Sequence, residues 1–366
     1  MYKLYIPVFR PFAPCSDFAR DVFNTLLIRF RESGRMNITV IGAGAWGTAL
    51  AISLAAHHRV TLWARGAAQI EALRATRYNQ HYLPEILLPA NLELSADFAA
   101  AAGAAELIII AVPTFALRSI LHQLLQLPRP VNLLWVCKGF EAETAKLPHQ
   151  VVAEVLPKGF QSGVLSGPSF AQEVARGLPT ALTLASADDG FARRTAQALH
   201  HARLRIYASS DVVGVEVGGA VKNVMAIAAG ICDGMGLGLN ARAALLTRGL
   251  AEITRLGLKL GGRSETLSGL SGVGDLILTS TGDLSRNRQV GLRLVQQHDL
   301  PEILRSLGHV AEGVYSVREV HHLAQSMGVA MPICESVYRI LYENISAEEM
   351  VTMLLNRAPN LEFDSI

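Results

Sequence analysis

Residues 37–47 read Asn-Ile-Thr-Val-Ile-Gly-Ala-Gly-Ala-Trp-Gly, and this stretch decides the fold. The run up to Ile41 is rich in β-branched residues and predicts a buried strand, and an apolar helix is expected directly after the glycines. Gly42 permits a tight turn, Gly44 lets a ligand approach the backbone, and Gly47 lets helix and strand pack closely. Between a strand and a helix, this glycine turn predicts a site for the pyrophosphate of a dinucleotide. The alternative is a structural turn in another α/β fold.

Downstream of the glycine turn, strand signals alternate with helical stretches such as residues 65–74 and 116–126. This alternation predicts a mostly parallel sheet, because each parallel pair of strands needs a crossover connection. Further strands are expected at Arg59–Ala64, Leu107–Val112, Asn132–Cys137, Gly163–Leu165, Thr180–Ala185 and Arg203–Tyr207. We therefore expect the α/β class, with an N-terminal Rossmann-type doubly wound sheet.

The strand signals stop at about Ser209, and long apolar segments with helical spacing follow. These segments are Asp211–Gly230, Arg242–Leu260, Ser285–Gln297, Glu312–Met327 and Pro332–Tyr342. We predict a dinucleotide-binding Rossmann-type domain at 36–208 and an all-α domain, which carries substrate binding and catalysis, at 209–366. Residues 1–35 have no apolar core or cleavage site typical of a secretory signal, and we expect an accessory, poorly ordered extension without a catalytic role.

Composition and charge exclude several kinds of partner. The chain has 366 residues, of which 50% are hydrophobic and 17% charged, and its formal net charge is +2. So small a charge creates no global field that attracts nucleic acid or an anionic membrane, and neither is expected as a partner. No uninterrupted apolar run approaches the length of a membrane span. The four cysteines lie far apart, which favours reduced, buried thiols and a cytoplasmic location.

The end of the second expected strand bears on the choice of cofactor. Sites that select NAD usually carry Asp or Glu there for the ribose hydroxyls, whereas residues 61–66 contain Arg65 and no acid. A guanidinium can bind the additional 2′-phosphate of NADP, which a carboxylate would repel. We interpret Arg65 as a sign of NADPH tolerance or preference; the alternative is a solvated arginine at the start of a helix.

Two further strand ends are expected to face the same crevice. Lys138 follows the strand at 132–137, and the segment Ser166-Gly167-Pro168-Ser169 follows a short strand. In open parallel sheets, ligands bind beyond the carboxyl ends of the strands. Lys138 is therefore a candidate to bind an anion, and Gly167 and Ser169 lie in a turn whose N–H groups can bind substrate. The alternative for Lys138 is a surface lysine.

The helix expected at 211–230 carries one lysine, Lys222, shortly after a pair of glycines. Burying an ammonium group costs free energy unless the group is paired or used. Desolvation also lowers the pKa of a lysine, which suits it to exchange a proton during reduction of a carbonyl. Lys222 is thus the candidate catalytic residue, and Asp275 is a candidate to orient it electrostatically. The alternatives are a lysine that reaches out of its helix and a helix-start cap by Asp275.

The segment Ser285-Arg286-Asn287-Arg288 opens a later helix. Arg286 and Asn287 can clamp a phosphate or carboxylate, because guanidinium presents a planar fork of donors. Ser285 is expected to cap the helix, which would direct free N–H groups at the same anion. The alternative is an ordinary capped helix, since capped helices with early arginines are common.

Taken together, these motifs resemble the bacterial NAD(P)-dependent sn-glycerol-3-phosphate dehydrogenases, from Asn37 to about Arg357. The resemblance rests on seven segments in the same order, at residues 41–49, 137–139, 166–171, 218–223, 274–276, 285–288 and 310–313. Two positions depart from the family pattern, because Ala45 stands where Ser is common and Ala311 where Val is commoner.

The resemblance implies roles for individual residues. Lys222 corresponds to the family's proton donor or acceptor. The family's substrate positions correspond to Lys138, Gly167, Ser169, Lys222, Asp275, Ser285, Arg286 and Asn287. Besides the glycines Gly42, Gly44 and Gly47, the NADPH contacts correspond to Ala45, Trp46, Arg65, Lys138, Ala171, Arg286, Val310 and Glu312.

The implied reaction is the reduction of dihydroxyacetone phosphate to sn-glycerol 3-phosphate with NADPH or NADH, which feeds glycerophospholipid synthesis. Hydride would pass directly from the nicotinamide to the ketone carbon, while Lys222 polarises the carbonyl and delivers the proton. No metal is expected, since the lysine does the electrophilic work. A homodimer is expected from the apolar helical domain.

Two other functions stay open at this point. A dehydrogenase of the same architecture can act on a β-hydroxyacid or on a nucleotide sugar, but the latter needs a catalytic cysteine, and Cys232 is interpreted as a core residue. A non-catalytic NADPH sensor would need neither Lys222 nor the cluster at 285–287. The histidine doublets at 57–58, 200–201 and 321–322 are interpreted as surface or capping residues and not as metal ligands, because neighbours on a helix point in different directions.

Overall fold

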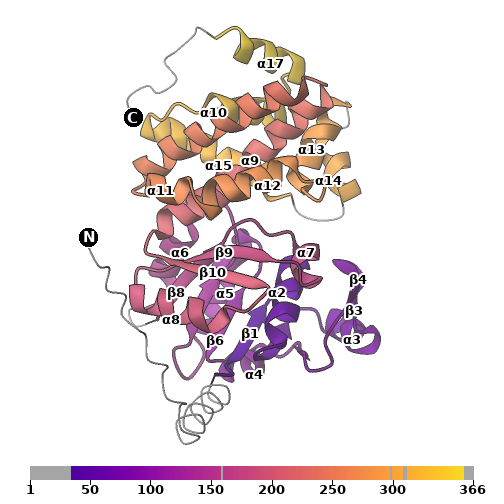
Figure 1. Ribbon diagram of the computed structural model, residues 1–366, viewed down its shortest axis with the longest axis vertical. Helices are drawn as coiled ribbons and strands as arrows, with labels where there is room; N and C mark the ends of the chain where they lie inside the picture. Colours follow the sequence, from indigo (N-terminus) through magenta and orange to yellow (C-terminus); the bar gives the residue numbers. More distant parts are fainter. Residues whose placement is uncertain (1–33, 158–159, 297–298, 308–310, 358–366) are drawn as a thin grey trace, which may run out of the picture. The chain divides into compact units, whose positions relative to one another are not determined.

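A computed structural model describes residues 34–157, 160–296, 299–307 and 311–357 (Figure 1). Contacts divide the chain into two compact units, Met1–Met36 and Asn37–Ile366. The predicted extension at 1–35 lies almost entirely outside the described residues, so the fold described below is that of the second unit.

The second unit begins with an eight-stranded sheet of order β10-β9-β8-β7-β6-β1-β2-β5. Its strands are β1 (Asn37–Ile41), β2 (Arg59–Trp63), β5 (Glu93–Ser95), β6 (Leu107–Ile110), β7 (Asn132–Trp135), β8 (Ser162–Ser166), β9 (Thr180–Ala185) and β10 (Leu204–Ser209). All neighbouring pairs are parallel except β8 and β9. The strand order reverses at β1, which is the switch point where open sheets of this kind bind ligands. The predicted Rossmann-type doubly wound sheet is confirmed.

Helices and a small second sheet form the connections between these strands. The helices are α2 (Ala45–Ala55), α3 (Ala67–Thr76), α4 (Phe98–Gly103), α5 (Thr114–Leu124), α6 (Pro148–Val155), α7 (Ala171–Ala175) and α8 (Asp189–Leu199), and the antiparallel pair is β3 (Tyr78–Asn79) and β4 (Leu83–Leu87). Side chains of α5 and α6 pack with those of β6 and β7 in one buried cluster. This packing fixes β7, which ends close to the candidate site.

The antiparallel pairing of β8 with β9 differs from the expected alternation. Between these strands the chain forms only the five-residue helix α7, which is too short to carry the chain back across the sheet for a parallel pair. The short strands β3, β4 and β5 were also not predicted. A strand of two to five residues has little periodicity of its own and depends on its pairing partner.

After β10 the described chain is helical. Its elements are α9 (Val212–Gly234), α10 (Gly238–Lys259), α11 (Ser264–Leu267), the π-helical turn η1 (Leu270–Gly274), α12 (Asp275–Thr281), α13 (Arg286–Val295), α14 (Leu300–Leu307), α15 (Glu312–Met327), α16 (Pro332–Tyr342) and α17 (Ala347–Leu355). The expected all-helical C-terminal part is confirmed. The domain limits 36–208 and 209–366 stay predictions.

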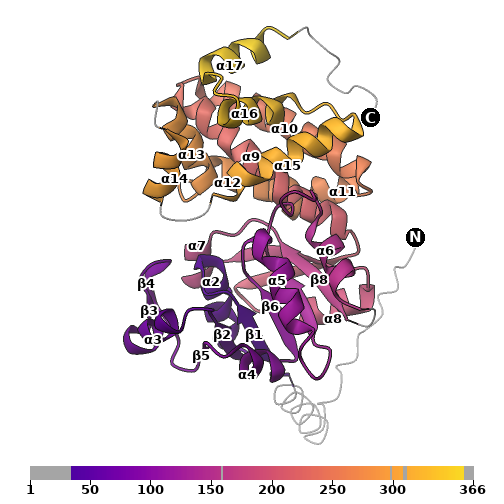
Figure 2. The ribbon, with the colours of Figure 1, turned by 180° about the vertical axis from the view of Figure 1, so that it is seen from behind.

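Helix α9 is the core of the helical part. It packs against α10, α12, α13, α15 and α16, and both views show it among them (Figures 1 and 2). By length and composition α9 could cross a membrane, contrary to the expectation that no segment approaches a span, but 89% of its apolar window is buried inside the structure. Its apolar character is therefore explained by packing against the other helices.

Two glycines let α9 and α13 approach closely. A Cβ atom on Gly230 would lie 2.1 Å from the carbonyl oxygen of Arg288, and one on Gly291 would lie 2.1 Å from that of Ile227. Such distances are far below van der Waals contact, so both positions need glycine. The close approach brings the N-terminus of α13, with the predicted substrate residues Arg286 and Asn287, next to α9.

Gly291→Ala is expected to force α9 and α13 apart. Overpacking of a tight contact costs about 1–3 kcal/mol, so we expect a loss of that size in the free energy of unfolding, measured by urea denaturation. Gly103→Ala is the matched control, because a Cβ there meets nothing within 4 Å and alanine favours its helix. Equal midpoints for both variants and the unmodified protein would show that the contact is not tight.

Candidate active site

Each glycine of the turn after β1 has its own structural reason. Gly42 has a φ of 116°, and a Cβ there would lie 2.4 Å from the carbonyl oxygen of Ala111. A Cβ on Gly47 would lie 1.9 Å from the carbonyl oxygen of Gly42, so helix and strand can pack only around glycine. Gly44 has a φ of −76° and a Cβ there would meet nothing within 4 Å. Neither backbone strain nor packing within the protein therefore requires glycine at position 44. A ligand that lies directly against the backbone would require it.

Two side chains that were not predicted hold this turn. The side-chain amides of Gln69 and Asn79 donate to the carbonyl oxygen of Ala43 at 3.1 and 3.0 Å, and Asn79 also donates to Thr48 Oγ1 at 2.8 Å. No side chain caps α2, so the first N–H groups of this helix are available to phosphate oxygens. The turn therefore fits the pyrophosphate of a dinucleotide. Ala45 and Trp46, the predicted contacts on this turn, form the start of α2 and are partly exposed.

Arg65 lies just beyond the end of β2 and is exposed. Among the residues that the structure describes it forms no ion pair, and β2 ends at Trp63 without a carboxylate before α3 begins. The guanidinium is thus available to an anion next to β2. This is the position that the prediction of NADPH binding requires.

Three elements distant in sequence bring two lysines to one carboxylate. Lys222 Nζ of α9 lies 2.5 Å from Asp275 Oδ1, and Lys138 Nζ, three residues after β7, lies 2.6 Å from Asp275 Oδ2. Asp275 is 1% exposed, so its negative charge is buried between two ammonium groups. We call Lys138, Lys222, Asp275 and the neighbouring Thr279 the lysine cluster.

Burial and charge shift the pKa values of the cluster in opposite directions. Burial lowers the pKa of Lys222, the carboxylate of Asp275 opposes this shift, and the ammonium of Lys138 adds to it, so that the pKa is about 8. Burial by itself would raise the pKa of Asp275, but the two lysines outweigh it and hold that pKa below its ordinary value. Lys222 can therefore exchange a proton near neutral pH while Asp275 stays ionised.

Thr279 and Gly167 complete the hydrogen bonds of the lysine cluster. Lys222 Nζ donates to Thr279 Oγ1 at 2.7 Å, and Thr279 lies one helical turn after Asp275 in α12. Lys138 Nζ lies 3.3 Å from the carbonyl oxygen of Gly167, which also accepts from Ser169 Oγ at 3.0 Å. Thr279 was not predicted, although its i, i+4 spacing from Asp275 places both on one helix face.

The N-terminus of α13 contacts α9 at Asn223, the residue that follows Lys222. Ser285 caps this helix as predicted, since its hydroxyl accepts from the N–H of Arg288 at 3.2 Å. Asn287 Nδ2 donates to Asn223 Oδ1 at 3.0 Å, and Asn287 Oδ1 accepts from the N–H of Gly313 at 3.0 Å. The amide of Asn287 thus joins α9, α13 and α15 and keeps one N–H for a ligand, and Asn223 is a residue that the prediction missed.

The remaining predicted residues are placed as follows. Arg286 is exposed at the first position of α13, and its charge opposes the rise that burial causes in the pKa of Glu312 at the start of α15. Ala171 begins α7 and is partly buried. Val310 lies outside the described residues.

A chain of contacts joins the glycine turn to the lysine cluster. The turn packs on Ala111, which follows β6, and Thr114 of α5 lies three residues further on. The Thr114 hydroxyl donates to the carbonyl oxygen of Lys138 at 3.1 Å. The glycine turn and the lysine cluster are therefore connected near the switch point of the sheet.

The described residues contain no group of three or more His, Cys, Asp or Glu side chains able to hold a metal ion. The histidine doublets were predicted to be surface or capping residues. His58 is 6% exposed, and its Nε2 lies 3.1 Å from the carbonyl oxygen of Ala198 in the last turn of α8, while the rings of His57 and His201 stack at 4.5 Å. Cys137, Cys232 and Cys334 are buried free thiols, as expected. Burial raises the pKa of the Cys232 thiol, so this residue is not an activated nucleophile.

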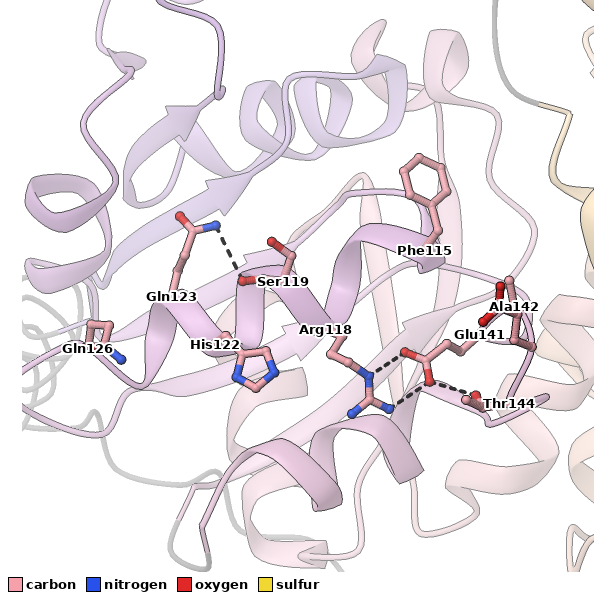
Figure 3. A pocket seen from close by; sticks show the side chains of 10 residues that line it. Phe115, Arg118, Ser119, His122, Gln123, Gln126, Glu141, Ala142 and Thr144 are labelled. Carbon is pink, nitrogen blue, oxygen red and sulfur yellow. Dashed lines mark hydrogen bonds and ion pairs between the residues drawn. The ribbon is translucent and has the colours of Figure 1, made fainter.

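A separate surface groove lies along α5 and the loop that follows β7 (Figure 3). Its lining residues are Phe115, Arg118, Ser119, His122, Gln123, Gln126, Glu141, Ala142, Glu143 and Thr144. Arg118 donates to both oxygens of Glu141 at 2.8 Å, so these two charges of the groove offset each other. None of the predicted site residues lines the groove.

Comparison with known proteins agrees with this geometry. Residues 37–192 match the family model of the N-terminus of NAD-dependent glycerol-3-phosphate dehydrogenase, and residues 211–352 match that of its C-terminus. The NAD(P)+ glycerol-3-phosphate dehydrogenase of Thiobacillus denitrificans is 63% identical over 328 residues, which cover 90% of this chain and 100% of that protein. The protein of the same name from Nitrosomonas eutropha is 58% identical over 329 residues, again 90% and 100% of the two chains. The crystal structure of glycerol-3-phosphate dehydrogenase from Coxiella burnetii is similar with a TM-score of 0.84 and 41% identity, and the similarity covers 88% of this chain and 99% of that one.

Asp275→Asn is expected to lower the pKa of Lys222 below about 8, because burial remains while the attraction that opposes it is lost. The pH dependence of Lys222 acetylation, followed by peptide mass spectrometry, measures this shift. Two ammonium groups would also be left without their carboxylate, which costs about 3–5 kcal/mol of unfolding free energy.

Glu343→Gln is the control, because it breaks the exposed Arg339–Glu343 pair of α16 and should change the unfolding free energy by about 0.5 kcal/mol or less. An unchanged Lys222 pKa in Asp275→Asn would contradict the electrostatic coupling.

Proposed function

The chain belongs to the NAD-dependent glycerol-3-phosphate dehydrogenase family and is an NAD(P)-dependent dehydrogenase, and we propose that it reduces dihydroxyacetone phosphate to sn-glycerol 3-phosphate, a precursor of glycerophospholipids. The observation that carries this proposal is the lysine cluster, where two ammonium groups share the single carboxylate of Asp275. The excess positive charge suits a small anionic substrate, and a lysine with a pKa near 8 suits a carbonyl that must gain a proton.

Lys222 is proposed as the general acid of the reduction. A bound nicotinamide supplies the hydride to the ketone carbon. Lys222 holds its proton at Nζ, oriented by Asp275 Oδ1 at 2.5 Å and Thr279 Oγ1 at 2.7 Å, and delivers it to the ketone oxygen, which becomes the new hydroxyl. Because the reduction uses the ammonium form, kcat/KM should decline as the pH rises through about 8.

The substrate phosphate is proposed to bind at the N-terminus of α13. Arg286 is exposed there and offers a planar fork of donors, and the first N–H groups of the helix carry partial positive charge. Asn287 has one N–H left for the phosphate after its bonds to Asn223 and Gly313. Binding energy from the phosphate, remote from the reacting carbon, would fix the position of the ketone next to Lys222.

The cofactor is proposed to be NADPH in preference to NADH. The glycine turn fits the pyrophosphate of NADPH and of NADH equally, because Gly44 leaves open space in front of the uncapped helix α2. Arg65 supports the preference, since it is exposed and lies where a selective NAD site carries an acid. We assign the dinucleotide to a domain at 36–208 and the substrate phosphate to a domain at 209–366.

We also propose that the enzyme works in the cytoplasm as a homodimer. The free buried thiols Cys137, Cys232 and Cys334 are consistent with a reducing compartment. The helical part exposes large apolar side chains such as Leu239, at 70% exposure, which support burial against a second copy.

Lys222→Met is expected to lower turnover by about 10²–10⁴-fold, because the acid is lost while the cofactor site is untouched. Absorbance of NADPH with dihydroxyacetone phosphate as substrate measures turnover, and fluorescence titration measures the NADPH Kd, which should not change. Lys259→Met, at an exposed position that ends α10, is the control and should keep full activity. Near-normal turnover of Lys222→Met would refute the mechanism.

Arg65→Asp is expected to raise the KM for NADPH by about tenfold or more, since a charge-assisted hydrogen bond of about 1.5–3 kcal/mol is replaced by repulsion. The KM for NADH should stay level or fall. Steady-state kinetics with both cofactors decide, and Arg59→Asp at the other end of β2 is the matched control. Equal effects on the two cofactors would mean that Arg65 is only a solvated residue at the start of a helix.

A further inference from the structure

A second buried charge lies on α9, six residues before Lys222. Glu216 is 5% exposed, and both of its carboxylate oxygens are hydrogen-bonded. Oε1 accepts from the indole N–H of Trp135 at 2.8 Å and from the backbone N–H of His149 at 2.9 Å, while Oε2 lies 2.5 Å from His149 Nδ1. We call Glu216, Trp135 and His149 the Glu216 group. The mechanism proposed above does not use it.

The partners of Glu216 belong to the sheet part of the molecule. Trp135 is the last residue of β7, and the chain continues from it to Lys138. His149 lies in the first turn of α6, whose N-cap residue Leu147 offers no side-chain hydrogen bond. One carboxylate therefore satisfies a buried indole and a helix-start N–H that would otherwise lack a partner. Glu216 thereby fastens α9 to β7 and α6.

The two charges of α9 face different neighbours. Six residues correspond to about 9 Å along a helix and about 240° around it, so Glu216 contacts β7 and α6 while Lys222 contacts α12. Between them, Gly219 lies against the stem of Lys138, because a Cβ there would be 3.6 Å from Lys138 Cγ and Cδ. The strand end that carries Lys138 and the helix that carries Lys222 are therefore packed together between the Glu216 group and the lysine cluster.

We propose that Glu216 is a positioning residue, whose bonds to Trp135 and His149 hold α9 against β7 so that Lys222 and Lys138 both reach Asp275. The catalytic consequence rests on the proposed function, because it assumes that Lys222 delivers the proton. A displacement of about 1 Å in a reacting group can cost about 100-fold in rate, so a small shift of α9 is enough to matter.

Two substitutions at Glu216 separate positioning from charge. Burial raises the pKa of Glu216, and glutamine has the shape of the protonated acid. Glu216→Gln keeps an oxygen for the two N–H donors and an N–H for the imidazole, which can change tautomer. Glu216→Leu has a similar size but leaves both N–H donors buried without an acceptor, so the fastening is lost.

Glu252 supplies a matched control elsewhere in the helical part. This carboxylate of α10 is 1% exposed and accepts from the backbone N–H groups of Ile333 and Cys334, at 2.7 and 3.1 Å, in the first turn of α16. Neither α10 nor α16 carries a residue of the lysine cluster. Glu252→Leu therefore removes a buried carboxylate of the same kind and leaves the hydrogen bonds between α9 and β7 in place.

The experiment measures five quantities in each full-length variant, and all but the unfolding midpoint are measured well below the unfolding temperature. They are kcat and KM for dihydroxyacetone phosphate with NADPH, the Kd of NADPH, the pKa of Lys222 from the pH dependence of its acetylation, and the unfolding midpoint. We expect Glu216→Leu to lower kcat by about tenfold or more, and to move the Lys222 pKa away from about 8, because the distances from Lys222 to Asp275 and Lys138 change. Glu216→Gln should stay within about threefold of the unmodified enzyme, and Glu252→Leu should lower the unfolding midpoint but change neither kcat nor the Lys222 pKa.

His149→Ala is the milder variant should Glu216→Leu not fold, because it removes one of the three bonds and leaves the backbone N–H in place. It should lower kcat by a smaller factor in the same direction. The proposal is overturned if Glu216→Leu, or His149→Ala in its place, loses stability but keeps the kcat and Lys222 pKa of the unmodified enzyme, as Glu252→Leu should. If the unmodified enzyme does not turn over dihydroxyacetone phosphate, the proposed function fails, and the acetylation data still decide the role of Glu216.

Discussion

The carboxylate of Asp275 is the contact on which the arrangement of the site depends. It lies between the ammonium groups of Lys138 and Lys222, at 2.6 and 2.5 Å, and joins the end of a strand, the core helix α9 and α12. One negative charge does not balance two positive ones, and Arg286 and Glu312 add one ionisable group of each sign nearby. The low dielectric of a buried site strengthens this excess. A site built this way favours a dianionic phosphate ester over a neutral substrate, and it keeps Lys222 protonated only as long as Asp275 stays ionised.

Helix packing sets the distances at which these charges meet. Gly230 and Gly291 let α9 and α13 come closer than any side chain would permit, and the Asn223–Asn287 bond is formed where the two helices touch. Without such an approach, the start of α13, where we propose that the substrate phosphate binds, would lie a side chain's width further from Lys222. The apolar character of α9, which by composition alone resembles a membrane span, also helps to set these distances. It buries the helix among its neighbours and leaves the charged groups as the exceptions that must find partners.

Much of this could be predicted from the sequence where the signal is local. The turn at Gly42–Gly47 was predicted with the separate role of each glycine, and Ser285 was predicted as a cap, because both depend on residues within one turn of each other. The antiparallel pairing of β8 with β9 and the short strand β5 were not predicted, since pairing direction and short strands depend on partners far along the chain. Asn79, which holds the glycine turn from β3, has no local signal at all.

The same distinction separates Lys222 from Glu216. One rule, that a charge in an apolar helix must be paired or used, singled out Lys222 from the sequence and applies equally to Glu216, six residues earlier. The rule states that partners exist but not which ones. The structure assigns the lysine to a carboxylate shared with a second cation, and the glutamate to an indole and a helix start. Two cations around one carboxylate leave one positive charge unbalanced, which is available to a ligand. A carboxylate that already accepts from three hydrogen-bond partners has little capacity left for a ligand. The fold decides how many partners each buried charge has. This number therefore distinguishes a group that can act on a substrate from one that only positions the elements around the site.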